Sequence, residues 1–425
     1  MSPGRADAWS GRELHLIGLG GAGMSAYAIA AYALGATVTG SDRAWSPYAQ
    51  ELLEQTGIEV AVGHDPANVP PGDHVEVFHS TAIPDDNPER AAARERGLPD
   101  RSRTELLGQI AAQRRVIAVA GAHGKTTTTA MVAVALRAGG LEPGWLIGGE
   151  VPDLGANAGW GTGEWLVVEA DESDRSFLAL APEIAIVTNV ELDHHAVFRT
   201  LADIEEAFAQ FIAQSGRAIV TPPVAPLARD ALGTDRVTVV GEHVDGLTVP
   251  GAHNQTNAAL ALAAVTQAGG DEAAALAALR AFRGVGRRFE EVGRSAGGAV
   301  VIDDYAHHPT EIAATIAAAR ERGPQRIVAV FQPHLYSRTA ALAPEFGAAL
   351  AHADTAWVLD VYPAREQAAD FPGVSGRLVA DAAGGRYAAS FDDAERQLAS
   401  ELRDGDLCLV MGAGDVTELA RRLVA

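Results

Sequence analysis

The chain has 425 residues, of which 48% are apolar, and its formal net charge at pH 7 is -22. This length is enough for two to four globular domains, and the negative charge argues against nucleic acid and anionic membranes as partners, because both attract basic proteins. The only cysteine, Cys408, excludes an internal disulfide, and we find neither a signal peptide nor an uninterrupted apolar run of membrane-spanning length, so we expect a cytoplasmic protein.

The first predicted unit is a strand, a glycine-rich turn and a helix. The strand covers residues 14–17, and Gly18, Gly20 and Gly23 then match the pattern G-x-G-x-x-G. A second strand, residues 37–42, ends at Asp42. The pattern indicates a phosphate held at a helix N-terminus, but it does not say which nucleotide carries the phosphate. A tight turn without a ligand is the alternative.

The second unit, residues 117–129, reads IAVAGAHGKTTTT and resembles a phosphate-binding P-loop with unusual spacing. The standard pattern has a glycine five residues before the Gly-Lys pair, and here that position is Val119. Lys125 is the only lysine in the chain, and every other basic side chain apart from histidine is arginine. A loop wrapped around phosphate oxygens can require the compact charge of lysine. We therefore predict that Lys125 binds phosphate; the alternative is that this one lysine survived by chance.

Acidic residues follow the next two predicted strands. The segment EWLVVEADESD contains Glu169, Asp171 and Glu172, and the segment IAIVTNVELDHH ends with Asp193, His194 and His195 and also contains Glu191. Adjacent parallel strands would bring these groups to the sheet edge that carries Lys125, where carboxylates suit Mg²⁺. Solvated strand ends are the alternative.

Further candidate binding residues lie at the start of a predicted helix and in three later segments. In GAHNQTNAALALAAV, Asn254 is either a helix N-cap or, with Asn257, a contact for adenine. The later segments are DDYAHHPTE, FQPHLYSRT and DVYPAREQ. His307 and His308 could bind a metal, but substrate contacts fit better because no matched zinc-ligand spacing is present. Arg338 could pair with a carboxylate through two hydrogen bonds.

Strands alternate with helices along the chain, which predicts an α/β protein with mostly parallel sheets flanked by helices. We place domain boundaries near residues 110 and 290. The predicted domains are therefore residues 1–110, 111–290 and 291–425.

Taken in order, these motifs resemble the Mur ligase family over nearly the whole chain. The matching blocks are HLIGLGGAGMS, GAHGKTTTT, EADESDRSF, HNQTNA, GRRFE, DDYAHHPTE, QPHLYSRT and MGAGD. The short ATP loop of the family, G-x-H-G-K-T-T-T, accounts for the unusual spacing at Lys125. The resemblance implies a Rossmann-like first domain that binds a UDP-sugar, a P-loop ATPase-like central domain, and a Rossmann-like third domain that positions an amino acid.

The resemblance also implies a reaction. With ATP and Mg²⁺, L-alanine would be joined to the lactoyl carboxylate of UDP-N-acetylmuramate through an acyl phosphate, as a step of peptidoglycan precursor synthesis. The last three blocks favour this alanine-adding activity over the sister activities. The partners would be these small molecules, with no nucleic acid or membrane, and the protein would be a monomer or weak homodimer.

Site residues follow from the positions of the family motifs. Catalysis would use Lys125, Glu169 and His194, and the metal ligands would be Thr126, Glu169 and His194. The ATP site would comprise Gly121, Ala122, His123, Gly124, Lys125, Thr126, Thr127, Asn254, Asn257, Arg288 and Asp304. The UDP-sugar site would comprise Gly20, Ala22, Gly23, Met24, Asp42 and Ser80. The amino-acid site would comprise Tyr305, His307, His334 and Arg338.

Three other functions remain open. A recycling ligase that attaches a ready-made peptide to the same sugar nucleotide shares the first domain and the P-loop, but it differs in the block QPHLYSRT. An NAD-dependent dehydrogenase built on the glycine turn would leave the Lys125 loop unexplained. A non-catalytic nucleotide sensor would leave the third-domain motifs unexplained.

Overall fold

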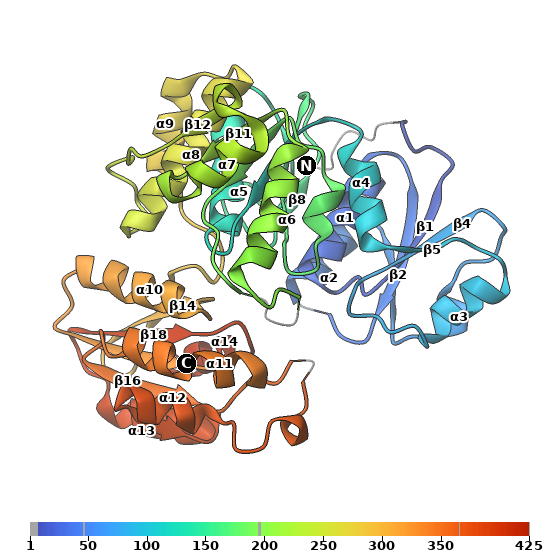
Figure 1. The fold of residues 1–425 in the computed structure, drawn as a ribbon. Coiled ribbons are helices and arrows are strands. Elements are labelled where there is room, and N and C mark those ends of the chain that lie inside the picture. Colours follow the sequence, from blue (N-terminus) through green and yellow to red (C-terminus); the bar gives the residue numbers. More distant parts are fainter. Residues whose placement is uncertain (1–6, 46, 194–196, 365, 425) are drawn as a thin grey trace. The chain divides into compact units, whose positions relative to one another are not determined.

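The computed structural model describes residues 7–45, 47–193, 197–364 and 366–424 (Figure 1). These residues form three mostly parallel β-sheets accompanied by helices, which confirms the predicted α/β fold class. The chain divides into two compact units: Met1–Val244 with Thr256–Phe282, and Asp245–Gln255 with Arg283–Ala425. The first unit contains two of the sheets and the second unit contains the third. The domain boundaries near residues 110 and 290 remain a prediction.

The first sheet is parallel throughout, with strand order β3-β2-β1-β4-β5. Its strands are β1 (Glu13–Ile17), β2 (Thr37–Asp42), β3 (Glu59–Val62), β4 (Val75–His79) and β5 (Asp100–Ser102). The helices that accompany it are α1 (Ala22–Ala33), α2 (Pro47–Thr56), α3 (Pro88–Glu95) and α4 (Arg103–Ala111). The glycine turn joins β1 to α1, as the G-x-G-x-x-G pattern predicted.

The central sheet has strand order β12-β11-β10-β6-β9-β7-β8 and is parallel except for the pair β7 and β8. Its strands are β6 (Arg115–Ala120), β7 (Gly144–Leu146), β8 (Ala158–Gly159), β9 (Trp165–Glu169), β10 (Ile184–Val187), β11 (Arg217–Val220) and β12 (Val237–Val239). The helices are α5 (Lys125–Ala138), α6 (Leu201–Ala213), α7 (Ala225–Leu232), α8 (Ala252–Ala268) and α9 (Glu272–Arg280). The Lys125 loop follows β6, which lies between β9 and β10. The acidic residues that follow β9 and β10 therefore lie on either side of this loop.

The third sheet has strand order β13-β14-β18-β15-β16-β17, and only β13 is antiparallel. Its strands are β13 (Glu290–Arg294), β14 (Val300–Asp304), β15 (Arg326–Phe331), β16 (Thr355–Leu359), β17 (Arg386–Ala388) and β18 (Asp406–Met411). The helices are α10 (Pro309–Glu321), α11 (Tyr336–Leu350), α12 (Gly376–Ala383), α13 (Phe391–Glu401) and α14 (Thr417–Arg422).

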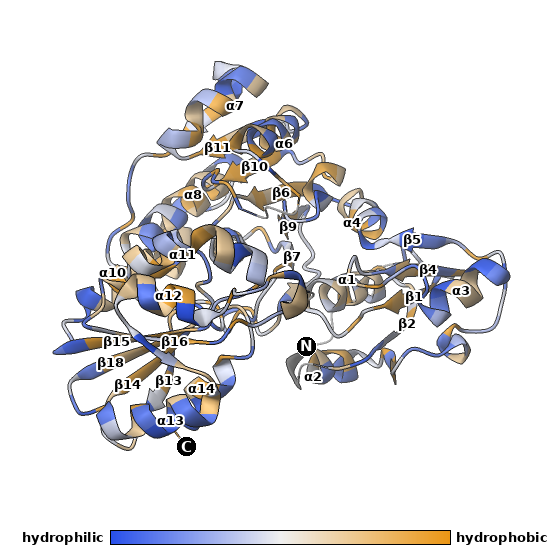
Figure 2. Cartoon of the chain, turned by 60° about the horizontal axis from the view of Figure 1, so that its bottom comes forward, coloured by the Kyte–Doolittle hydropathy of each residue, from blue (hydrophilic) through white to orange (hydrophobic). Residues whose placement is uncertain are grey.

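Alternate residues of one strand pack on opposite faces of a sheet, and the buried clusters follow this period of two. In the third sheet, Ile302 packs with residues of α10, α11 and α12, whereas its neighbour Val301 packs with residues of α13 and α14. Strands covered on both faces are continuous apolar runs. Figure 2 shows this for β6, β10 and β11, while the surface helix α13 is largely hydrophilic. Within the described residues, every helix is too short or too polar to cross a membrane.

A buried carboxylate joins several elements of the first sheet. Glu89, in the first turn of α3, accepts hydrogen bonds from Ser41 Oγ (2.7 Å) and Asn68 Nδ2 (3.0 Å), and it contacts His15 Nε2 (2.8 Å) and His64 Nδ1 (3.2 Å). Burial alone would raise the pKa of Glu89, but the hydrogen bonds of His15, Ser41 and Asn68 lower it to about 2. The ionised Glu89 therefore ties β1, the end of β2 and the loop after β3 together.

We expect Glu89→Gln to lower the free energy of unfolding by about 3 kcal/mol at pH 7, since a buried hydrogen-bonded charge is removed from its partners. A carboxyl whose pKa is depressed on folding stabilises the protein above its unfolded pKa of 4.5, and this contribution is lost as the pH falls towards 2. Urea unfolding followed by circular dichroism measures the change. Glu95→Gln, at the exposed end of the same helix, is the control, and equal stability of the two variants would contradict the role of Glu89.

Candidate functional site

The Lys125 loop has an unusual spacing because β6 continues through Val119 and ends at Ala120. The turn begins one residue later, at Gly121, whose φ of 143° is in a region that favours glycine. Gly124 also has a positive φ, 79°, and directly precedes α5, which begins at Lys125. The position that lacks the expected glycine is thus inside a strand.

Both glycines of this loop also lie against other segments. A Cβ on Gly121 would lie 2.0 Å from Thr188 Oγ1, and a Cβ on Gly124 would lie 3.1 Å from Asn257 Oδ1. The first backbone N–H groups of a helix have no carbonyl acceptor within the helix. Those at the start of α5 can therefore donate to phosphate oxygens.

The ammonium of Lys125 folds back onto its own loop. Its Nζ donates to Gly121 O (2.7 Å) and to Glu172 Oε1 (2.9 Å), and the Glu172 side chain is fully buried. Burial disfavours the charged ammonium, but Glu172 and Asp171 outweigh this effect and raise the pKa of Lys125. Lys125 therefore stays a cation in a buried position, as phosphate binding requires.

Glu169 and Thr126 form the predicted oxygen-ligand pair beside Lys125. Thr126 Oγ1 donates to Glu169 Oε1 at 2.8 Å, and Gly148 N donates to Glu169 Oε2 at 2.6 Å. Burial raises the pKa of Glu169 although these two hydrogen bonds and Lys125 act to lower it. A nearby cation would lower the pKa of this carboxyl group and favour its ionised form, which fits the predicted metal-ligand role.

The other wall of the loop comes from the segment after β10. His123 N donates to Asn189 Oδ1 (2.9 Å), Asn189 Nδ2 donates to His123 O (3.0 Å), and His123 Nε2 lies 3.3 Å from Glu191 Oε2. Sequence analysis missed Asn189, whose only signal is its place two residues after β10, a strand neighbouring β6. His194 and His195 lie outside the described residues, so the role of His194 remains a prediction.

The two asparagines of α8 have separate roles. Asn257 lies against Gly124, as described above, which supports its assignment to the nucleotide site. Asn254 lies in the first turn of α8, and its Nδ2 donates to Pro250 O at 2.7 Å. An N-cap side chain instead precedes the helix and accepts from its N–H groups, so the N-cap alternative for Asn254 is wrong.

The glycine turn after β1 is closed by Asp42 at the end of β2. Gly20 N donates to Asp42 Oδ2 at 2.8 Å, and a Cβ on Gly20 would lie 2.4 Å from Ala44 O. A Cβ on Gly18, whose φ is 89°, would lie 2.8 Å from Ser80 Cβ. The structure thus brings the predicted residues Gly20, Asp42 and Ser80 together at the carboxyl edge of the first sheet.

The start of α1 carries the remaining residues of this predicted group. Ala22 O accepts a hydrogen bond from Asn157 Nδ2 at 3.0 Å, and Met24 is buried in the core. A Cβ on Gly23 would lie 3.5 Å from Arg103. Asn157 belongs to the segment before β8, so the start of α1 is attached to the central sheet.

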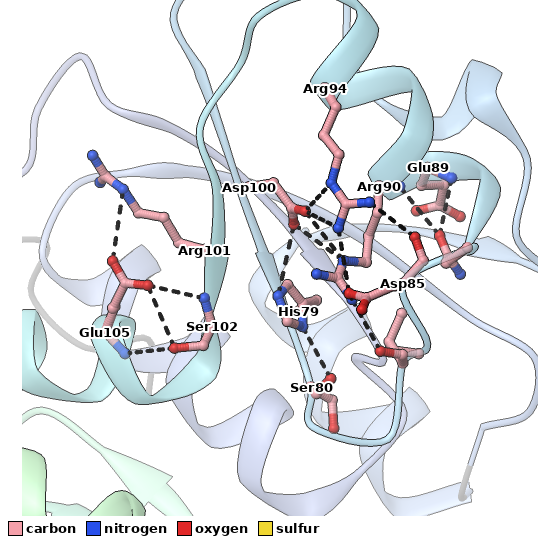
Figure 3. A network of polar contacts seen from close by, with 12 residues as sticks. His79, Ser80, Asp85, Glu89, Arg90, Arg94, Asp100, Arg101, Ser102 and Glu105 are labelled. Atoms are coloured by element: carbon pink, nitrogen blue, oxygen red, sulfur yellow. Dashed lines mark hydrogen bonds and ion pairs between the residues drawn. The ribbon is translucent and has the colours of Figure 1, made fainter.

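A network of ion pairs holds the loop that begins at Ser80 (Figure 3). Arg90 of α3 lies 2.9 Å from Asp85 and 3.2 Å from Asp100, and its Nη1 donates to Ile83 O. Arg94, one turn later, lies 2.8 Å from Asp100. These arginines therefore fix the loop against β5 and keep Ser80 near the glycine turn.

In the second unit, Asp304 ends β14 and is almost fully buried. It accepts hydrogen bonds from Phe289 N (2.7 Å) and Ala306 N (2.8 Å). Burial raises the pKa of Asp304 to about 6, although Arg288 and these two N–H groups act to lower it. Arg288 lies 3.7 Å from Glu311.

Four rings line the carboxyl edge of the third sheet. The ring centroids of Tyr305 and His307 are 5.2 Å apart, those of His307 and His334 are 6.2 Å apart, and those of His334 and Tyr362 are 5.6 Å apart. Arg338 is buried at the start of α11. The structure brings together the three predicted rings and adds Tyr362, which sequence analysis did not assign. His308 caps α10, because its Nδ1 accepts from Thr310 N.

Family models match three successive segments of the chain. Residues 13–115 match the catalytic domain of the Mur ligase family, residues 119–229 match the Mur ligase middle domain, and residues 287–414 match the glutamate ligase domain of Mur ligases.

Two curated relatives and two solved structures cover nearly the whole chain. UDP-N-acetylmuramate–L-alanine ligase of Paenarthrobacter aurescens is 44% identical over 95% of each chain. The enzyme of the same name from Saccharopolyspora erythraea is 43% identical over 100% of this chain and 95% of its own. The crystal structure of UDP-N-acetylmuramate-alanine ligase MurC from Thermotoga maritima has a TM-score of 0.80 at 28% identity, covering 97% of this chain and 98% of its own. That of a murein peptide ligase from Psychrobacter arcticus has a TM-score of 0.71 at 25% identity over the same shares.

We expect Lys125→Arg to reduce turnover more than tenfold, because a planar guanidinium cannot keep the compact contacts to Gly121 O and Glu172. Phosphate release measures turnover, and thermal unfolding checks the fold. Arg137→Lys, near the far end of α5, is the matched control and should keep the wild-type rate. A Lys125→Arg enzyme with more than about a tenth of the wild-type rate, a ~1.4 kcal/mol effect, would refute the compact-charge argument.

The raised pKa of Asp304 predicts a pH-dependent effect of Asp304→Asn. A carboxyl whose pKa rises from 3.8 to about 6 on folding makes the wild type lose stability as the pH rises through that window. The variant lacks this loss, so its stability relative to wild type should improve by about 1 kcal/mol between pH 5 and pH 8.

Urea unfolding at the two pH values measures the difference. Asp354→Asn is the control, because the Arg320 hydrogen bond lowers the pKa of Asp354 and so places its contribution below this pH range. A constant difference between Asp304→Asn and wild type would show that Asp304 does not titrate as described.

Proposed function

The chain belongs to the Mur ligase family, and from this we propose that it joins L-alanine to UDP-N-acetylmuramate while ATP is cleaved to ADP and phosphate. The observation that carries the proposal is the 44% and 43% identity, over nearly the full chain, to relatives named for this reaction. The reaction would belong to peptidoglycan precursor synthesis in the cytoplasm. The contacts around Lys125 support the ATP-dependent part of the proposal.

The proposed chemistry has two steps. An oxygen of the lactoyl carboxylate attacks the γ-phosphorus of ATP, the bond to the β,γ-bridging oxygen breaks, and an acyl phosphate and ADP form. The amine of L-alanine then attacks the acyl carbon, and the tetrahedral intermediate expels phosphate and loses a proton to give the amide. A carboxylate is a poor electrophile, so phosphorylation supplies the leaving group that amide formation needs.

The Lys125 loop would serve the first step. Transfer of a phosphoryl group to a carboxylate brings two anions together, so positive charge must lie close to the transferred group. Lys125 would exchange its contacts with Gly121 O and Glu172 for phosphate oxygens, while the N–H groups at the start of α5 bind other oxygens. Asn257, beside Gly124, and Asn254 would contact the adenine side, and the family motifs also assign Arg288 and Asp304 to ATP.

Thr126 and Glu169 fit the Mg²⁺ that the family implies. Their oxygens already lie 2.8 Å apart, and a bound cation would offset the effect of burial, which raises the pKa of Glu169. When bound there, Mg²⁺ would neutralise charge on the phosphate oxygens. His194 would contribute to a second metal.

The other two groups would hold the remaining substrates. The turn containing Gly20, Ala22 and Gly23, with Met24, Asp42 and Ser80, would bind the UDP-sugar. Tyr305, His307 and His334 would surround L-alanine, and Arg338 would pair with its carboxylate.

Product analysis tests the proposal. The protein is incubated with ATP, Mg²⁺, UDP-N-acetylmuramate and one amine substrate, and both phosphate release and product mass are recorded. We expect alanine-dependent phosphate release and a product heavier than UDP-N-acetylmuramate by one alanine residue. A tripeptide substrate tests the recycling activity, and NADH binding tests a dehydrogenase. Turnover with the tripeptide but not with L-alanine would overturn the proposal.

A further inference from the structure

One guanidinium lies between the two predicted phosphate-binding loops of the first unit. Arg103 begins α4, and its Nε lies 3.2 Å from Asp174 Oδ2 while its Nη2 lies 3.5 Å from Asp171 Oδ2. Its Nη1 lies 3.5 Å from the point that a Cβ on Gly23 would occupy. The side chains of Arg103 and Asp174 are 16% and 18% exposed, so solvent screens this pair only partly, and the Asp171 side chain is more exposed, at 38%.

Asp171 therefore lies in the field of two cations. It belongs to the segment after β9 that also carries Glu169 and Glu172. Glu172, the next residue, accepts a hydrogen bond from Lys125 Nζ at 2.9 Å, and Asp171 itself lies 3.5 Å from Arg103. The Asp171 side chain is 38% exposed, so it is a partly exposed carboxylate that pairs with Arg103 beside the Lys125–Glu172 pair.

The compensation of these acids by Arg103 affects the negative charge that surrounds Lys125. Charges at short range in a partly buried region interact more strongly than they do in bulk water. Without Arg103, the charges of Asp171 and Asp174 would be left uncompensated close to the ATP loop. These acids would then attract Lys125 more strongly and repel the phosphates that compete for the same ammonium.

We propose that Arg103 is a positioning residue for the ATP site, which neutralises Asp171 and Asp174 so that Lys125 remains available for phosphate. The inference rests on the proposed function, because it takes Lys125 as the phosphate-binding ammonium. Arg103 touches neither ATP nor the reacting atoms in this proposal, and it acts through the two acids.

A double-mutant cycle tests the proposal, with the dissociation constant of the non-hydrolysable ATP analogue AMPPNP measured by calorimetry at fixed Mg²⁺. We expect Arg103→Met to weaken AMPPNP binding about tenfold. Adding Asp171→Asn to this variant should return the affinity to within about threefold of wild type, because the uncompensated charge is removed. Loss of a purely structural contact would not be repaired by removing a second partner.

The matched control is Arg101→Met, two residues earlier on β5. Arg101 pairs with Glu76 and lies near Glu105 (Figure 3), so its removal should leave AMPPNP affinity within about twofold of wild type. Should Arg103→Met not fold, Arg103→Gln keeps a polar side chain of similar length, and the same comparison with Asp171→Asn decides.

The outcomes separate this inference from the proposed function. If wild type does not bind AMPPNP, the proposed function fails. If wild type binds but Arg103→Met binds equally well, or Asp171→Asn does not restore its affinity, the positioning role of Arg103 is wrong and the proposed function stands.

Discussion

An ammonium group held inside a protein needs an anion close to it, and the pair formed by Lys125 and Glu172 meets this need at the edge of the central sheet. The pairing of β6 with β9 supplies the geometry, because parallel neighbours end side by side and deliver the lysine loop and the acidic segment to one place. The two positive-φ glycines, the Thr126–Glu169 contact and the pairing of Asp171 with Arg103 all depend on this arrangement.

The same local hydrogen-bond arrangement occurs in each of the three sheets. A carboxylate at the end of a strand accepts a hydrogen bond from a backbone N–H of another segment: Asp42 from Gly20, Glu169 from Gly148, and Asp304 from Phe289. Each bond fixes a turn at the carboxyl edge, where parallel sheets bind ligands. Part of the negative charge of this acidic chain is thus compensated by hydrogen bonds from its own backbone N–H groups and by ion pairs with its own cations. This compensation allows an acidic chain to bind anionic substrates.

The fold could be predicted well because apolar runs, glycine turns and helices alternate locally, as in the residues before and after Gly18 and Gly121. The sheet edge that collects Lys125, Glu169 and Glu172 also followed from parallel pairing. What could not be predicted depends on contacts between residues far apart in the chain. The partners of Glu89 come from three separate segments. Arg103 lies outside the quoted motifs, and Asn189 lies within a quoted segment but carried no signal of its own. The antiparallel β13 was also not predicted, although the five residues between β13 and β14 contain the hairpin signal Gly297-Gly298.

The solitary position of Lys125 has a consequence for protein chemistry. Apart from an α-amino group, an amine-directed acylating reagent has one side chain to modify in this protein. Acylation requires the neutral amine, but burial among Gly121 O, Glu172 and Asp171 keeps Lys125 charged and bonded in the closed loop. A labelled side chain therefore marks a molecule whose loop has opened at least once. The rate of labelling would count those openings at a single defined atom.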